Sequence, residues 1–386
     1  MSIPGPRSTL PYIGRFHDVD RNNPSRSMKK LSDQYGGLFS MTLSGETHIW
    51  VGRSDIAFDL LCKNAAICSG RADLGAYPGV TKDSGTFLYL ENLVRQRKFT
   101  HTVILRNVTS NFSGYITLEA KRYFYNLLAR PSDFHYESYL FCARVTARLS
   151  YGSPGSAEAH LRNSREFIHQ LSPSGPITNM IPALGYLPEW LVPSKREVRV
   201  RQRREAKLWI GLYKKAEQTY EEGGAPFTYV SAYLDSKREG GKNQLFDDEM
   251  EAIYTIGMVG TVAIVTIAGA LTLFIMAMIL HPEWQDKVRE IDAESGDRLV
   301  ELSDAPRLPT LWVAIKEYLR WKPTVPLEED YSYDGYHFPN TLLFTSLTLP
   351  FPANQTGIKM PRVITRVDGW AKSLLGPRDL WRNIFD

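Results

Sequence analysis

The order of apolar and polar positions predicts a mainly helical chain with one small sheet near its beginning. Apolar and polar side chains alternate over Leu38–Leu43 and again over Thr47–Gly52, and the Ser-Gly-Glu segment between them is typical of a hairpin turn. Residues 26–35 predict a short polar helix, and Asp55–Lys63 has apolar residues at helical spacing. From there to about residue 300 the spacing stays mostly helical, with interruptions at prolines and glycines.

The longest apolar segment runs from Ala252 to Leu280 without a single charged residue. As a helix it would be roughly 43 Å long, more than the hydrocarbon core of a bilayer requires. A helix through the centre of a large helical domain is also apolar on every face. Periodicity does not separate a membrane span from a core helix, so both interpretations stay open at this point.

Composition and charge exclude several classes of protein. The chain has 386 residues, 43% hydrophobic and 23% charged, which excludes wholesale disorder. A net charge of +4 is too small for a dedicated nucleic-acid binder. The three cysteines, Cys62, Cys68 and Cys142, argue against a disulfide scaffold and for an intracellular protein. The first residues contain no apolar core of a signal peptide.

A run of charged residues between Ser194 and Lys207 has two interpretations. It contains five arginines among its fourteen residues, which is compatible with a patch for anionic lipid or nucleic acid. It is equally compatible with a solvated helix face whose arginines are partly paired by glutamates. We favour the second interpretation, because the net charge is small and no aromatic residue is interleaved.

Three motifs follow the apolar segment in a characteristic order. They are His281-Pro282-Glu283-Trp284-Gln285, Arg307-Leu308-Pro309, and a Glu-x-x-Arg helix, Glu317 to Arg320, that ends in Trp-Lys-Pro. In this order they resemble the cytochrome P-450 family of haem-thiolate monooxygenases, in particular those of fungal natural-product pathways. The resemblance covers roughly residues 3–345. We expect residues 1–345 to form one domain, whereas residues 346–386 look like a divergent tail.

The resemblance implies a mainly α fold with a small β-sheet (α+β), incomplete at its C-terminal end. It also implies roles for four residues. Thr266 would face bound oxygen, Arg97 would hold a haem propionate, and Glu317 with Arg320 would hold the structural core. No set of metal ligands is predicted, and we interpret His281 and His337 as ordinary surface or packing histidines.

The chain departs from the family pattern at three places. The acid that precedes the threonine in the family is Val265 here, and valine cannot relay protons. We therefore expect Thr266 to bond a carbonyl of its own helix. The family tryptophan before Arg97 is Leu93. Finally, no cysteine follows Cys142, although a thiolate in a late loop is the family's iron ligand.

These departures predict a monooxygenase-like protein of secondary metabolism that lacks monooxygenase activity, with haem absent or not bound through a thiolate. The family implies an apolar small molecule and an NADPH reductase as partners. We expect a monomer that binds no nucleic acid. Two alternatives remain: a non-redox pocket enzyme, such as a cyclase or isomerase, and a membrane-anchored scaffold protein that uses Ala252–Leu280.

Overall fold

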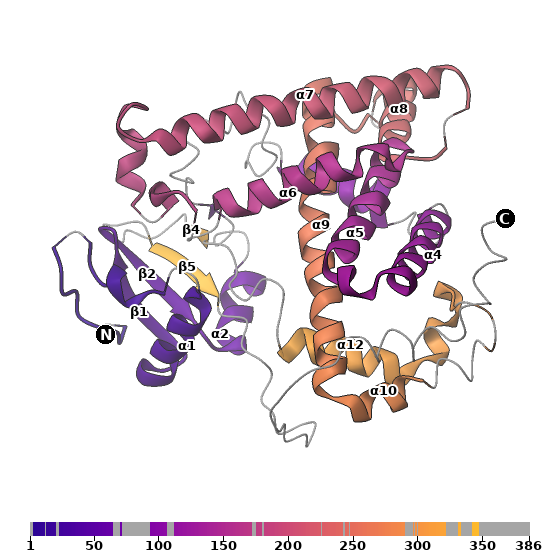
Figure 1. Ribbon diagram of the computed structural model, residues 1–386. Coiled ribbons are helices and arrows are strands. Elements are labelled where there is room, and N and C mark those ends of the chain that lie inside the picture. Colours follow the sequence, from indigo (N-terminus) through magenta and orange to yellow (C-terminus); the bar gives the residue numbers. More distant parts are fainter. Residues whose placement is uncertain are drawn as a thin grey trace.

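The chain folds into a helical body with a small sheet at one side of it (Figure 1). The computed structural model describes residues 3–11, 13–20, 23–64, 70–71, 93–105, 112–171, 175–179, 181–224, 226–241, 244–246, 248–289, 296, 298, 300–321, 331–332 and 342–346. Its main helices are α1 (Pro24–Tyr35), α2 (Ser54–Phe58), α3 (Leu93–Phe99), α4 (Ser113–Ala129), α5 (Phe134–Tyr151), α6 (Ala157–Leu171), α7 (Pro193–Glu221), α8 (Tyr229–Glu239), α9 (Glu249–Leu280), α10 (Pro282–Val288) and α12 (Pro309–Trp321). The strands are β1 (Leu38–Leu43), β2 (Glu46–Val51), β3 (Gly70–Arg71), β4 (Tyr331–Ser332) and β5 (Leu342–Ser346).

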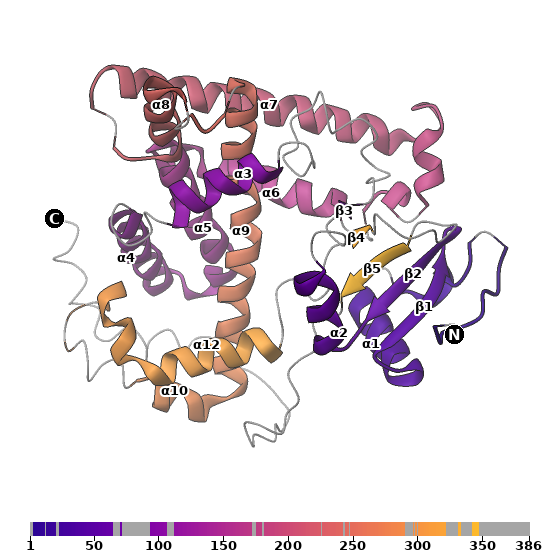
Figure 2. The same ribbon diagram turned by 180° about the vertical axis from the view of Figure 1, so that it is seen from behind.

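The apolar segment forms the axis of the helical body as helix α9. The helix begins after Asp248, whose carboxylate accepts a hydrogen bond from the backbone N–H of Met250 at 2.9 Å. It ends before Pro282, which lacks the N–H that a further turn would need. Along its length α9 packs against α5, α6, α7, α8, α10 and α12 (Figures 1 and 2).

Large side chains fill the interface of α9 with its neighbours. The principal apolar cluster joins α7, α8 and the first half of α9, and its fully buried members include Trp209, Tyr213, Tyr233, Phe246 and Ile256. Aromatic rings are prominent at this junction and contribute large buried apolar side chains to the helical body. The prediction of a mainly α fold with a small sheet is confirmed.

The sheet joins parts of the chain that are far apart in sequence. Its strand order is β1-β2-β5-β4-β3. The predicted hairpin of β1 and β2 is present, and its turn uses Ser44 and Gly45, both with positive φ. Strand β5 then pairs in parallel with β2, which the sequence analysis did not foresee. Helix α1 covers the hairpin and packs Met28 and Leu31 against Phe39.

The charge run lies in the N-terminal part of α7. Arg199 pairs with Glu189, and Arg204 pairs with Glu166 of α6. Arg201 differs from the predicted solvated face, because its side chain is buried and lies 2.9 Å from Glu205. Two arginines of this segment therefore attach α7 to residues outside the helix.

Candidate functional site

Thr266, the predicted oxygen-facing residue, lies near the middle of α9 and is half-buried. Its hydroxyl lies 3.2 Å from the carbonyl oxygen of Val262 and 3.3 Å from that of Ala263. The hydroxyl proton is thus directed at the helix's own backbone, as expected for a threonine without an acidic neighbour. Val265 beside it contributes only a hydrocarbon side chain, so this turn of α9 contains no titratable group.

Arg97 lies on the short helix α3, and its side chain is exposed. The neighbouring Arg95 lies 3.7 Å from Glu251, which places α3 beside the first turn of α9. Figure 2 shows α3 crossing near this end of α9, well above the level where α12 crosses it. The role of Arg97 as a propionate ligand stays a prediction.

Glu317 and Arg320 lie one helical turn apart on α12, as the motif requires. The helix attaches to the C-terminal end of α9, where Tyr318 packs edge-on against Phe274 with ring centroids 5.4 Å apart. Glu317 is half-buried, whereas the side chain of Arg320 lies outside the described part of the chain. Arg97, Thr266 and Glu317 therefore lie on three different helices, α3, α9 and α12.

The described thiols do not fit a haem-thiolate centre. Cys142 of α5 is 3% exposed and lies in an apolar cluster with Leu161 of α6 and Ile264 of α9. Burial raises the pKa of Cys142 to about 12, so its sulfur stays protonated at neutral pH. Cys62 is exposed on the π-helical turn Asp59–Lys63. Cys68 lies outside the described residues.

The histidines considered in the sequence analysis are not arranged as ligands. His281 is buried at the junction of α9 and α10, and its Nδ1 lies 3.3 Å from Oε1 of Glu283. It thus occupies a packing position between two helices, as we interpreted it. His337 lies outside the described residues. Within the described part of the chain, no group of three or more His, Cys, Asp or Glu residues is placed to hold a metal ion.

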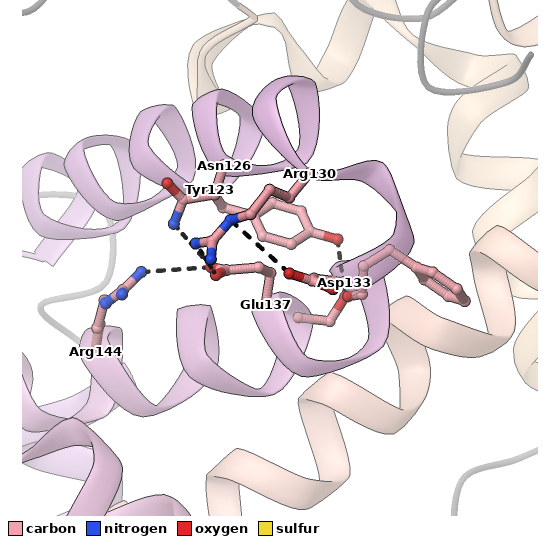
Figure 3. Close-up of polar contacts among 8 residues, drawn as sticks. Tyr123, Asn126, Arg130, Asp133, Glu137 and Arg144 are labelled. Atoms are coloured by element: carbon pink, nitrogen blue, oxygen red, sulfur yellow. Dashed lines mark hydrogen bonds and ion pairs between the residues drawn. The ribbon is translucent and has the colours of Figure 1, made fainter. Parts of the chain in front are cut away.

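A buried carboxylate on α5 forms the densest polar cluster between α4 and α5 (Figure 3). Glu137 accepts a hydrogen bond from Nδ2 of Asn126 at 2.8 Å. Its oxygens also lie 3.6 Å from Arg130 and 3.7 Å from Arg144. A carboxylate whose oxygens are all engaged by neighbouring donors holds helices together and is not free to act as an acid or base.

One open depression of about 760 Å³ lies away from Thr266. It is bounded by the start of α4 and by the 3-10 helix Leu302–Arg307, and α9 contributes no residue to it. Its lining consists of Ser113, Gly114, Thr117, Leu118, Lys121, Glu301 and Ser303. A non-redox pocket enzyme would need polar groups that converge near Thr266. This depression does not supply them.

Sequence reasoning missed His160, the most unusual titratable group in the helical body. Its ring is 1% exposed, and neither ring nitrogen has a hydrogen-bond partner. Burial lowers the pKa of His160 to about 4. Nothing in the local sequence marks it, because a histidine within a helix of mixed polarity gives no sign of how deeply its ring will be buried.

Comparison with known proteins extends over nearly all of the described fold. Residues 4–348 match the sequence model of the family described as Cytochrome P-450. The cytochrome P-450 monooxygenase virE of Hypocrea virens is 32% identical over 356 residues, which cover 87% of this chain and 63% of the relative. Two further monooxygenases, fogE of Aspergillus ruber and claR of Ampulloclitocybe clavipes, are 27% and 28% identical.

Each alignment covers a larger share of this chain than of the relative. Each of the two further alignments covers 87% of this chain but only 65% of the relative. The chain thus spans less than two thirds of the length of each of these three curated relatives.

Proposed function

Because the chain belongs to the cytochrome P-450 family, we propose that it is a P-450 protein of natural-product metabolism whose 386 residues do not by themselves perform haem-thiolate oxygenation. The observation that carries this proposal is the state of Cys142. Its thiol is protonated and enclosed by aliphatic side chains, whereas iron ligation in this family requires an accessible thiolate.

The surroundings of Thr266 support the same conclusion. Activation of dioxygen requires protons to be delivered by titratable groups or ordered water. Here the hydroxyl of Thr266 is committed to backbone carbonyls, and the adjacent position is Val265. Both the ligand that would make the iron reactive and the relay that would supply protons are thus unsuited to the reaction in this chain.

The ligand and partner classes follow from the family. We propose an apolar small molecule as the ligand, because the exposed face of α9 is aliphatic around Ile267. A reductase is needed only by a chain that holds a reducible haem, so we do not propose one for this chain alone. No described feature favours the cyclase or isomerase alternative.

The test is the spectrum of the purified chain after addition of haem, reduction and exposure to carbon monoxide. We expect no Soret band at the position that is diagnostic of thiolate ligation. The virE protein of Hypocrea virens, treated in the same way, serves as the positive control for reagents and handling.

A Cys142→Ala variant makes the test specific. If the chain gives a thiolate-type band and this variant loses it, Cys142 is a ligand and the proposal is wrong. A thiolate-type band that persists in the variant would identify Cys62 or Cys68 as the ligand and would contradict the proposal equally.

A further inference from the structure

His160 and its surroundings form a junction of three helices, α5, α6 and α9. The imidazole stacks on the ring of Tyr151 of α5 with centroids 5.6 Å apart and an interplanar angle of 23°. One turn further along α6, the hydroxyl of Ser164 donates to the carbonyl oxygen of Thr261 in α9 at 2.6 Å. Helix α6 is therefore attached to both neighbours through the face that carries His160.

Within the described part of the chain, neither ring nitrogen of His160 has a hydrogen-bond partner that could compensate a positive charge. From α5 the ring meets Tyr151, whose pKa is raised by burial, so its hydroxyl stays neutral. Helix α9 contributes Thr261, the acceptor of the Ser164 hydrogen bond, and carries no Asp, Glu, Lys or Arg from Ala252 to Leu280. The 3-10 helix Pro154–Ser156, which also packs against α6, contains no titratable residue.

The acidic side chain of α7 that contacts α6, Glu205, is already engaged by other donors. Glu205 of α7 accepts a hydrogen bond from Asn163 at 2.7 Å and lies 2.9 Å from Arg201. Arg201 also donates from Nε to Gln170. Arg204 pairs with Glu166 at the surface. Both of these carboxylates, Glu205 and Glu166, are therefore paired with arginines and not with His160.

The same helix covers Cys142. Ala157 and Leu161 of α6 pack in one apolar cluster with Cys142 of α5 and with Ile264 and Ala268 of α9. Since Leu161 and His160 lie on the same turn of α6, displacement of this helix as a unit brings the His160 ring to water and also removes the cover from the thiol. Exposure of Cys142 thus reports the position of α6.

We propose that α6 is an acid-released element: protonation of His160 frees it from α5 and α9 and exposes the thiol of Cys142, while the rest of the helical body stays folded. The docked state binds fewer protons than the released state, because the pKa of His160 is near 4 when docked and near 6.5 when exposed. Docking is therefore strongest above about pH 6.5 and weakens as the pH falls toward 4.

The experiment measures labelling of Cys142 in a Cys62→Ser, Cys68→Ser variant with 4,4′-dithiodipyridine. The rate at each pH is divided by that of N-acetylcysteine, which removes the intrinsic pH dependence of the reagent. Between about pH 7 and about pH 5 we expect the normalised rate to rise about 20-fold, as the two pKa values require. A normalised rate that stays constant over this range would overturn the proposal.

Two substitutions assign the effect to the buried ring. His160→Phe keeps an aromatic ring against Tyr151 but cannot be protonated, so we expect its normalised rate to be independent of pH. His169→Gln, at an exposed position of the same helix, should behave like the parent chain. If His160→Phe retains the 20-fold rise, the titrating group is a different one and the inference is wrong.

Two measurements on the parent chain do not depend on any variant. The imidazole resonance of His160 should titrate well below those of the surface histidines, and a midpoint near the ordinary value would refute the proposal. Hydrogen exchange at about pH 5 should accelerate in α6 but not in α8. Simultaneous exchange of both helices would mean global unfolding and would refute a local release.

Discussion

At the residue scale, Gly257 shows how one position controls the approach of two helices. It lies on α9 where the helix meets the fully buried indole of Trp209 from α7. A Cβ atom at this position would lie 2.3 Å from Cδ2 and 2.5 Å from Cγ of Trp209. Because the indole is enclosed on all sides, it cannot retreat without displacing other core residues.

We therefore predict that Gly257→Ala lowers the free energy of unfolding by about 1–3 kcal/mol, a value typical of overpacked cores. Gly211→Ala on α7 is the matched control, since a Cβ atom there meets nothing within 4 Å. It should be neutral or stabilising by up to about 1 kcal/mol, because alanine favours the helix. Urea unfolding of the two variants tests this, and equal stabilities would show that Gly257 and Trp209 do not make this contact.

At the element scale, polar contacts join α4 to α5 in addition to the ring contact of Tyr123 with Phe141. Glu137 and Glu119, both buried on the facing sides of these helices, are each engaged by arginines. Tyr123 of α4 adds a hydrogen bond of 2.8 Å to Ser138 of α5. Removal of one partner from such a network leaves the other charge desolvated and unpaired.

We predict that Glu137→Gln destabilises the chain by about 3 kcal/mol, because Arg144, only 14% exposed, loses its carboxylate partner. Arg130→Ala should cost less than about 1 kcal/mol, because Arg130 is 63% exposed and its ion pair is screened by water. Thermal or urea unfolding distinguishes the two. A larger loss for Arg130→Ala than for Glu137→Gln would contradict this account of the cluster.

At the scale of the whole molecule, α9 is both a core helix and long and apolar enough to cross a bilayer. It is the one helix among the described residues that meets these criteria of length and composition. Six other helices pack along it, and its polar Thr255 and Thr261 are buried against them. Only 28% of its most apolar stretch is buried, so α9 serves as the axis of the helical body and still presents apolar surface outside it.

We predict that extraction of a membrane fraction with alkaline carbonate releases the chain. Ile267→Lys, at a position 50% exposed, should leave the chain folded and change stability by less than about 0.5 kcal/mol. Ile264→Lys, at a fully buried position, should prevent folding. Retention of the parent chain in the pellet, together with impaired insertion of Ile267→Lys, would instead establish a membrane span.

The sequence alone determined the elements whose signals are local. The hairpin turn and the helical spacing of α1 each depend on neighbouring residues, and the structure confirms both. The back-bonding of Thr266 was also predictable, since it requires only the helix's own carbonyls. The family motifs added the order of the later elements.

Only the tertiary structure decided the properties that depend on neighbours distant in sequence. The parallel pairing of β5 with β2 joins residues separated by almost 300 positions, and no local pattern specifies it. The burial of Arg201 and His160, and the enclosed state of Cys142, arise where several helices meet. A pKa or a ligand role follows from the solvent and charges around a group, and these are set only when the helices pack.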